Sequence, residues 1–260
     1  KRTNVADVFA LYPAAKKYYD WRKMYDEMGK SIDAVMCATA DHTHAIISAH
    51  AITLGKHVYT QKPLTHSVYE SRLLTKLAAK YKVATQMGNQ GSSAEGVKLI
   101  CEWIWNGEIG EVRKIEAYTN RPIWPQGGDR PEGSDPVPDT LDWEMWNGPA
   151  PERKYDPAIH TQWRKLWDYS GGQMSYQGIH QLDVARWLCG VDYPRSVYCV
   201  GGIFNSQGAA ETPDTQSAVF EFPKLLMTYD QTLYTPYMLE SDDGIRNGDI
   251  FPHWPQNATR

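Results

Sequence analysis

The chain has 260 residues, of which 42% are hydrophobic and 22% charged, a composition typical of a globular, water-soluble protein. A net charge of −4 and scattered lysine and arginine residues provide no basic surface, so nucleic acid is not an expected partner. No apolar run approaches the roughly 18 residues that span a bilayer, which argues against a membrane-spanning helix and makes the cytoplasm the default compartment. A periplasmic location remains an alternative, because the chain begins at Lys1 rather than at a methionine.

The first part of the chain alternates between helical and strand patterns. Helices are predicted over 5–29, where Pro13 interrupts the pattern, and over 43–55, and a capping box of Ser67 and Glu70 predicts a third helix. Three short apolar runs are predicted to be buried strands: 34–38, 57–60 and 83–87. Strands and helices that alternate at this spacing form a parallel sheet with right-handed crossovers. This part is therefore predicted to belong to a doubly wound α/β domain.

The pattern changes after Gly91, so we divide the chain into a domain over 1–91 and a second over 92–260. A Pro-, Gly- and Asp-rich loop over 121–160 carries several tryptophans, which suit an aromatic-lined sugar pocket: Trp124, Trp143 and Trp146. The second domain is predicted to contain helices over 94–107 and 176–189 and extended segments over 110–120, 195–204, 215–222 and 224–233. The last three segments are typical of an antiparallel sheet.

Ligands of open α/β sheets bind beyond the carboxyl ends of the strands. Three polar stretches follow the predicted strands at this edge: Thr39–His44, Gln61–Pro63 and Gly88–Gln90. Pro63 would stiffen the turn that carries Lys62, but on this evidence alone a solvated turn lysine is the favoured interpretation. The sequence contains no G-x-G-x-x-G, so spacing alone does not predict a nucleotide site.

A second candidate is His180, on the predicted helix over 176–189, with Asp183 one turn later. A helical histidine is more often a packing residue than a catalyst, and Asp183 could be only its local hydrogen-bonding partner. Five further histidines, at positions 42, 44, 50, 57 and 66, would scatter over different faces. We therefore predict no metal site.

Two long segments resemble the Gfo/Idh/MocA family, the relatives of glucose-fructose oxidoreductase and inositol 2-dehydrogenase. The first is "DAVMCATADHTHAIISAHAITLGKHVYTQKPLTHSVYES", which is similar to the family's strand, Thr-Pro-x-x-x-His loop, Ala-Gly-Lys-His-Val and Glu-Lys-Pro-Leu. The second is "WRKLWDYSGGQMSYQGIHQLDVARWLCG", which resembles the family's Gly-Gly-x-x-x-Asp-x-Gly-x-His-x-x-Asp helix. The two motifs occur in the family's order, and the resemblance runs from about residue 5 to at least residue 235.

The resemblance implies a Rossmann-type domain followed by an α/β domain with a large, open, mostly antiparallel sheet. It implies NAD or NADP as cofactor, a sugar or polyol as substrate, and a homo-oligomer, either a dimer or a tetramer. It also implies that the chain lacks the family's first strand with its Gly-rich turn and part of its C-terminus. The absence of G-x-G-x-x-G would then reflect truncation, and the pyrophosphate would lose the helix N-terminus that holds it.

The resemblance also carries roles onto individual residues. Lys62 would lie beside the nicotinamide and the reacting hydroxyl, and His180 would act as the acid/base for the hydroxyl proton. The implied cofactor-binding residues are Thr39, His44, Gln61, Lys62, Asn89, Gln90, Trp163 and Arg164. The implied substrate-binding residues are Lys62, Trp163, Tyr176, His180 and Asp183.

This sequence departs from the family pattern at three positions. Gln61 stands where the family has a glutamate, which removes a charge that could pair with Lys62. Tyr176 replaces the aspartate four residues before His180, and we expect it to face the same pocket as a hydrogen-bond donor or proton relay. Ala40 replaces the proline of the Thr-Pro loop.

Three functions follow as hypotheses. The first is an NAD(P)-dependent oxidoreductase acting on a sugar, sugar derivative or cyclitol, with Lys62, His180 and Tyr176 as catalytic residues. The second is a redox-neutral enzyme that retains NAD and cleaves or exchanges sugars, a hypothesis motivated by Gln61 and Tyr176. The third is a non-catalytic sugar-binding paralogue that has lost the carboxylate at position 176.

Overall fold

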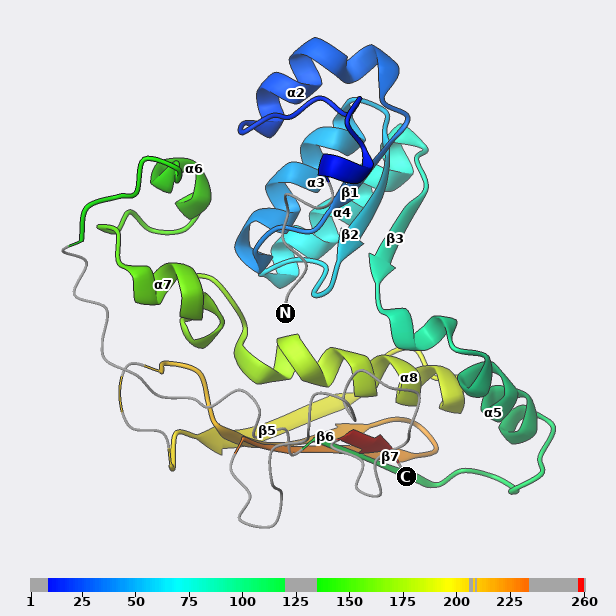
Figure 1. Cartoon of the computed structure of the whole chain (residues 1–260). Coiled ribbons are helices and arrows are strands. Elements are labelled where there is room, and N and C mark those ends of the chain that lie inside the picture. Colours follow the sequence, from blue (N-terminus) through cyan, green and yellow to red (C-terminus); the bar gives the residue numbers. More distant parts are fainter. Residues whose placement is uncertain (1–8, 120–134, 206–207, 209, 234–256, 260) are drawn as a thin grey trace.

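Figure 1 shows the computed structural model, which describes residues 9–119, 135–205, 208, 210–233 and 257–259. A three-stranded parallel sheet with its helices is followed by a five-stranded, mostly antiparallel sheet. Helix α8 lies on the second sheet, on the side that faces the first unit (Figure 1). The predicted fold class, a Rossmann-type unit followed by an α/β unit with a large sheet, is confirmed. None of the helices in these ranges has the length and apolar character that crossing a bilayer requires.

The parallel sheet aligns the carboxyl ends of its strands. Its strands are β1 (Ala34–Cys37), β2 (His57–Gln61) and β3 (Thr85–Gly88), in the order β1-β2-β3. Cys37 pairs with Thr60, and Gln61 pairs with Gly88, so the three strands end nearly level. The polar stretches that follow them therefore share one edge of the sheet, which we call the rim.

Helices α2 (Trp21–Met28), α3 (His44–Thr53) and α4 (Val68–Tyr81) pack against one face of this sheet (Figure 1). The buried core beneath them consists of Tyr25, Ala51, Ile52, Val58 and Leu74. The predicted capping box starts α4, with the Ser67 side chain accepting from the backbone of Glu70 and the Glu70 carboxylate accepting from the backbone of Ser67. Met36 of β1 is 74% exposed, because these helices leave the other face open.

The predicted helix over 5–29 is wrong in its extent within the described residues. Residues 12–20 are not helical, and α2 begins only at Trp21. Asp20 starts this helix, because its extended backbone lets its carboxylate accept a hydrogen bond from the Arg22 amide at 2.8 Å. Pro13, which lacks an amide hydrogen, lies in the non-helical stretch. Residues 1–8 of the prediction lie outside the described residues.

The second sheet has the strand order β5-β6-β7-β4-β8. All pairs are antiparallel except β4 with β7, which is parallel. Its strands are β4 (Lys114–Thr119), β5 (Ser196–Gly202), β6 (Thr215–Glu221), β7 (Leu226–Thr232) and β8 (Asn257–Thr259). The accompanying helices are α5 (Glu95–Trp105), α6 (Trp143–Asn147), α7 (Pro157–Gln162) and α8 (Ile179–Cys189).

Helix α8 packs on this sheet, with the small residue Ala185 at the centre of the contact. Ala185 of α8 is buried among Ile115, Phe222, Leu225 and Met227. A π-helical turn, Met174–Gly178, precedes α8, so the predicted helix over 176–189 begins with irregular geometry. At Gly178, a Cβ would lie only 3.0 Å from the ring of Tyr229, so a larger residue would push the turn away from the sheet. Turns of this kind inside helices are frequent at functional sites.

A buried carboxylate holds the loop between β5 and β6. Asp214 is fully buried and accepts hydrogen bonds from the backbone amides of Phe204 and Asn205, the latter at 2.9 Å. We expect Asp214→Ala to lower the free energy of unfolding by about 2–4 kcal/mol, because two amides lose a charged acceptor. Denaturant unfolding measures this loss. The exposed Asp192→Ala is the matched control, and equal stability of the two variants would contradict the role of Asp214.

Candidate active site

The candidate site lies where the rim meets the segment 163–178 of the second unit. Lys62, directly after β2, donates a hydrogen bond to the backbone carbonyl of Tyr176 at 2.8 Å, and its Nζ lies 3.5 Å from the centroid of the Tyr176 ring. The bond between Lys62 and Pro63 is a cis peptide bond. Lys62 is thus half-buried against the second unit, and the solvated turn lysine favoured by the pattern alone is not what the fold contains.

Arg164 adds a second cation to the same ring. It belongs to a 3₁₀ turn, Trp163–Lys165, and its Cζ lies 4.9 Å from the Tyr176 ring centroid and 4.2 Å from that of Trp163. Cations are attracted to the negative faces of aromatic rings at such distances. Trp163 itself is buried in the core beside Ile159. The fold therefore brings four predicted site residues into a row in which each side chain lies against the next: Lys62, Tyr176, Arg164 and Trp163.

Two further predicted residues, His44 and Thr39, lie in contact with each other at the rim. His44 is fully buried, with Nδ1 2.7 Å from the Pro63 carbonyl oxygen and Nε2 3.1 Å from that of Thr39. A neutral imidazole can donate through only one nitrogen, so both contacts are hydrogen bonds only in the imidazolium form. Thr39 also accepts a hydrogen bond from the Thr43 hydroxyl at 2.7 Å. His44 thus joins the ends of β1 and β2.

Asn89 brings an unusual amide group to the end of β3. The side chain is 8% exposed, and both its amide oxygen and its amide nitrogen are buried without a hydrogen-bond partner. Buried amides are nearly always paired, so an unpaired one at a rim is a candidate ligand contact. The neighbouring Gln90 is exposed. Gln61 covers Gly88, where a Cβ would lie 2.7 Å from the Gln61 amide oxygen.

The two α8 residues that the sequence singles out differ in their surroundings. His180 is half-buried at the start of α8, four residues after Tyr176. Asp183 accepts a short hydrogen bond from Ser92, which lies in the 3₁₀ turn after β3. Asp183 therefore links α8 to the end of β3. The described residues contain no group of three His, Cys, Asp or Glu side chains that could hold a metal ion.

Asp41 is the site residue that the sequence reasoning missed. It begins the 3₁₀ turn Asp41–Thr43 that follows β1, is 3% exposed and accepts a hydrogen bond from the buried hydroxyl of Ser170 at 3.0 Å. Burial raises the pKa of this carboxyl group, while the Ser170 hydroxyl and the charges of His44, Lys62 and Arg164 act to lower it. Its position in the stretch Thr39–His44, at the carboxyl end of a strand, was the available signal.

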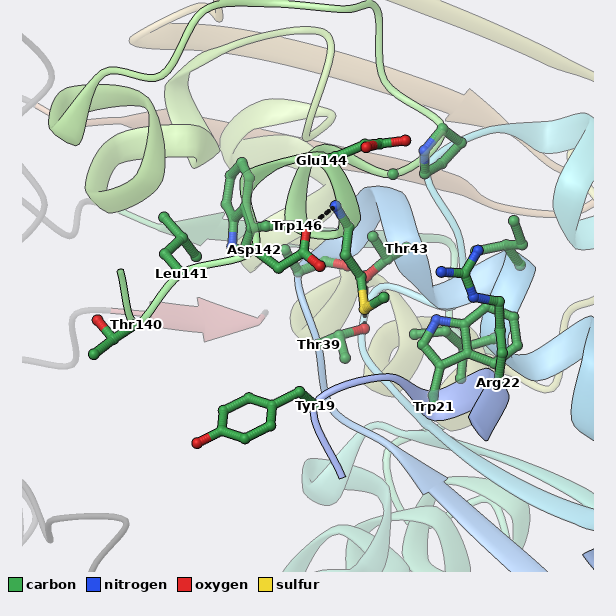
Figure 2. Close-up of a pocket in the computed structure, with 16 residues that line it drawn as sticks. Tyr19, Trp21, Arg22, Thr39, Thr43, Thr140, Leu141, Asp142, Glu144 and Trp146 are labelled. Atoms are coloured by element: carbon green, nitrogen blue, oxygen red, sulfur yellow. Dashed lines mark hydrogen bonds between the residues drawn. The ribbon is translucent and has the colours of Figure 1, made fainter. Parts of the chain in front are cut away.

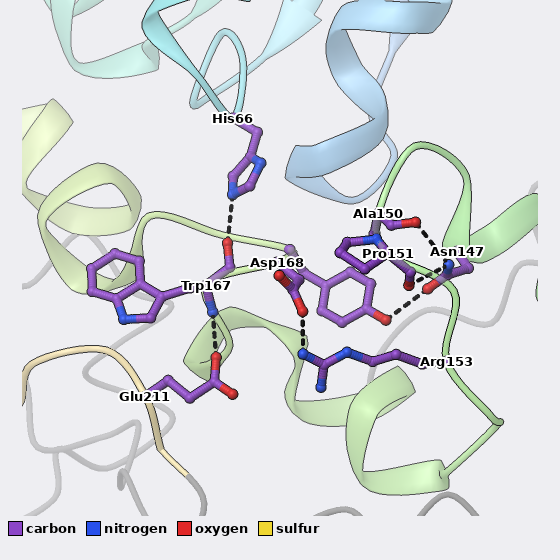
Figure 3. A network of polar contacts seen from close by, with 9 residues as sticks. His66, Asn147, Ala150, Pro151, Arg153, Trp167, Asp168 and Glu211 are labelled. Atoms are coloured by element: carbon purple, nitrogen blue, oxygen red, sulfur yellow. Dashed lines mark hydrogen bonds and ion pairs between the residues drawn. The ribbon is translucent and has the colours of Figure 1, made fainter.

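A network of polar contacts fixes the segment that carries Arg164 (Figure 3). The ring of His66, from the loop after Lys62, lies 2.8 Å from the Trp167 carbonyl oxygen through Nε2, and the Trp167 amide donates to Glu211 at 2.9 Å. The next residues are tied as well: Asp168 pairs with Arg153, and the Tyr169 hydroxyl donates to Asn147 at 2.7 Å. The segment is therefore held from the rim and from its own unit.

A cavity of about 610 Å³ adjoins Thr39 (Figure 2). Trp21 and Arg22 of α2 line one side, and Trp146 of α6 lines the other. Figure 2 also shows Asp142 accepting a hydrogen bond from the Met145 amide, at 3.0 Å, which caps α6. None of Lys62, Tyr176 and His180 lines this cavity, so it reaches only the Thr39 side of the candidate site.

Two tryptophans of the predicted loop pack against the core of the second unit. Trp143 and Trp146 stack on each other with ring centroids 5.0 Å apart, and both pack against the core that contains Trp163. The Trp143 indole donates to the Arg153 carbonyl at 2.7 Å. Only Trp146 of the two lines the cavity. Trp124 lies outside the described residues.

Family models match both units. Residues 1–89 match the model described as "Oxidoreductase family, NAD-binding Rossmann fold", and residues 109–234 match "Oxidoreductase family, C-terminal alpha/beta domain". The chain therefore belongs to the Gfo/Idh/MocA family of oxidoreductases.

Similar proteins include several that act on sugars or cyclitols. Levoglucosan dehydrogenase of Pseudarthrobacter phenanthrenivorans is 29% identical over 66% of this chain and 36% of that protein. 2,7-anhydro-N-acetylneuraminate hydratase of Escherichia coli is 24% identical over 75% of this chain and 44% of that protein. An inositol dehydrogenase homolog from Azotobacter vinelandii, complexed with NADH and myo-inositol, shares the fold with a TM-score of 0.62 at 18% identity, over 85% of this chain and 50% of that chain. The chain spans between about a third and a half of the length of these proteins.

Proposed function

We propose that the protein is an NAD(P)-dependent oxidoreductase that transfers a hydride between a nicotinamide cofactor and a hydroxyl-bearing carbon of a sugar, sugar derivative or cyclitol. The observation that carries the proposal is the meeting of Lys62, from the rim, with Tyr176 and Arg164, from the second unit. In open α/β sheets this edge is where ligands bind. Family membership and a relative named levoglucosan dehydrogenase support it.

The residues at the rim fit a nicotinamide nucleotide. The unpaired amide of Asn89 can both donate and accept hydrogen bonds, as a carboxamide ligand requires. Thr39 opens onto the cavity next to the end of β1. We propose these two residues, with His44, Gln61, Gln90, Trp163 and Arg164, as the lining of the cofactor site. When bound, the nicotinamide supplies the hydride acceptor.

The chain's own residues would handle charge and protons. The ammonium of Lys62 would stabilise negative charge that develops on the substrate oxygen as the carbonyl forms. His180 would accept the hydroxyl proton, since imidazoles as a class suit that task near neutral pH. Tyr176 would present its ring to the cations, and Asp183 would fix the start of α8 beside the substrate.

The test starts from the purified full-length protein and the nucleotide it carries. We expect denaturation to release NAD or NADP, identified by mass spectrometry, and we expect net formation of reduced nicotinamide with at least one member of a panel that contains levoglucosan and inositols. Binding of a panel sugar without any bound nucleotide and without turnover would contradict the proposal. That result would favour a sugar-binding paralogue.

A redox-neutral enzyme with retained NAD is the second candidate. The observation that favours it is the Tyr176 ring in contact with two cations, because a neutral ring changes the proton network of the site. A hydratase is among the similar proteins. In this case turnover would leave no net reduced nicotinamide. A stoichiometric yield of reduced nicotinamide would oppose it.

A further inference from the structure

Arg164 is a half-buried cation whose N–H groups find no acceptor in the part of the chain that the structure describes. Its Nε is buried and makes no hydrogen bond. Its two terminal nitrogens are not enclosed, and they form neither a hydrogen bond nor an ion pair with any described residue. A guanidinium carries five N–H donors, and arginine is rarely taken out of water without partners. The side chain is therefore placed for an acceptor that these residues do not supply.

Two aromatic rings fix the position of this guanidinium. Its Cζ lies 4.2 Å from the ring centroid of Trp163 and 4.9 Å from that of Tyr176. Trp163 is buried in the core of the second unit, so the surface under the cation is rigid. The N–H donors of a guanidinium lie in its plane, and contact with an aromatic face does not use them. The rings thus hold the cation and leave its donors available.

Positive charge is in excess around Arg164. The ammonium of Lys62 lies against the same Tyr176 ring, with Nζ 3.5 Å from the centroid. Asp41 and Asp183 bring carboxylates to the candidate site, but each accepts a hydrogen bond from a serine hydroxyl, and neither forms an ion pair with Arg164. Two fixed cations in a partly water-excluded site attract an anionic group. The ligand that this part of the site fits best is therefore negatively charged.

We propose that Arg164 binds the anionic group of an acidic sugar, a carboxylate or a phosphate, so that acidic sugar derivatives are the preferred substrates. The inference rests on the proposed function, because the same sugar would present its reacting hydroxyl to Lys62. Lys62 and Arg164 lie against one ring, so a molecule of sugar size can reach both. The edge of a guanidinium offers two parallel N–H groups, which match two oxygens of a carboxylate or phosphate. This role is additional to lining the cofactor site.

Binding of matched sugars tests the proposal without requiring turnover. The full-length protein is titrated by calorimetry, in the presence of NAD, with glucose, glucuronate and glucose 6-phosphate, and with the corresponding galactose series. We expect at least one acid to bind about 10- to 100-fold more tightly than its neutral counterpart, because a charged hydrogen-bonded pair is added. Preference for the uronate identifies a carboxylate as the ligand group, and preference for the sugar phosphate identifies a phosphate. If no acid bound more tightly than its neutral counterpart, water alone would satisfy the guanidinium and the proposal would fall.

Arg164→Gln removes the charge and should raise the Kd of the preferred acid by about 10- to 100-fold, with a much smaller effect on the neutral sugar. The matched control is Arg186→Gln, which removes an exposed arginine from the last turn of α8 and should leave the preference intact. Tyr176→Asp places a carboxylate beside the guanidinium, so the preference should disappear while the neutral sugar is still turned over. An acid preference that survives in Arg164→Gln would overturn the proposal. A loss of affinity confined to NAD or NADP would overturn it too, by assigning the guanidinium to a cofactor phosphate.

A measurement on the wild type covers the case in which Arg164→Gln does not fold. The Nε–H signal of Arg164 is followed by ¹⁵N NMR in the full-length protein, with Arg164→Lys used to assign it. Saturation with the preferred acid should shift this signal, because the guanidinium gains an acceptor, whereas the neutral counterpart should shift it much less. A signal that is unchanged by the saturating acid would contradict the proposed contact.

Turnover distinguishes a failure of this inference from a failure of the proposed function. An acid preference that depends on Arg164, in a protein that forms no reduced nicotinamide with any sugar, would refute the oxidoreductase and leave the anion site intact. Reduced nicotinamide formed equally well from acidic and neutral sugars, in the wild type and in Arg164→Gln, would refute the anion site and leave the oxidoreductase intact.

Discussion

Replacing Lys62 by alanine is expected to lower kcat/KM for the sugar substrate by about 100- to 1000-fold, which corresponds to about 2.7–4 kcal/mol of lost transition-state stabilisation. The reason is that the Lys62 ammonium lies against the Tyr176 ring, where the substrate oxygen would develop negative charge. Steady-state kinetics with reduced nicotinamide as the signal measures the loss. His180→Ala should cost about 100-fold or more through the missing proton acceptor.

The matched control is Lys80→Ala, which removes an exposed lysine from the last turn of α4. It should leave kcat/KM unchanged. If Lys62→Ala kept the turnover of the wild type while the fold remained intact, the assignment of Lys62 would be wrong. Circular dichroism and the unfolding midpoint establish whether the fold is intact.

Tyr176 should tolerate the loss of its hydroxyl but not the loss of its ring. Tyr176→Phe keeps the aromatic face under Lys62 and Arg164, so we expect kcat/KM to fall by no more than about threefold. Tyr176→Leu removes the face and should lower kcat/KM by about 3- to 30-fold, since cation–π contacts contribute about 0.5–2 kcal/mol. The same steady-state assay measures both variants.

Tyr176→Phe and Tyr176→Leu together distinguish a role of the Tyr176 ring from a role of its hydroxyl. A large loss of kcat in Tyr176→Phe would contradict the ring-based role and assign the hydroxyl as a proton relay. Tyr176→Asp adds a third test, because a carboxylate there would pair directly with Lys62 and Arg164. We expect it to retain more activity than Tyr176→Leu.

The parallel sheet and its rim could be predicted because their signals are local. Short apolar runs, a capping box at Ser67 and Glu70, and a glycine after α3 identify strands and helices within a few residues of each other. Parallel strands bring their carboxyl ends together, so the position of Lys62 directly after a strand is enough to assign it to the correct edge. The first helix was predicted to be too long. Asp20 has an extended backbone and caps the N-terminus of α2, and the apolar spacing ahead of Asp20 does not reveal this boundary.

The contacts across the two units could not be predicted in this way. Asp41 and Ser170 are 129 positions apart, and Lys62 and Tyr176 are 114 apart, so no periodicity relates them. The family pattern places a carboxylate at position 176, and only the fold shows the Tyr176 ring against two cations. Trp143 packs on Trp146 and the core, a contact that the sequence does not predict, since an aromatic in a loop carries no sign of which side it faces.

Hydride transfer that depends on Lys62 is the central claim, and single-turnover absorbance of reduced nicotinamide tests it most directly. Nucleotide-loaded protein is mixed once with each sugar of the panel, and the same experiment is repeated with Lys62→Ala. We predict a rise that persists with at least one sugar and is slowed by about 100-fold or more in the variant. No rise at any time with a sugar that the protein demonstrably binds, or an equal rise in Lys62→Ala, would contradict the claim.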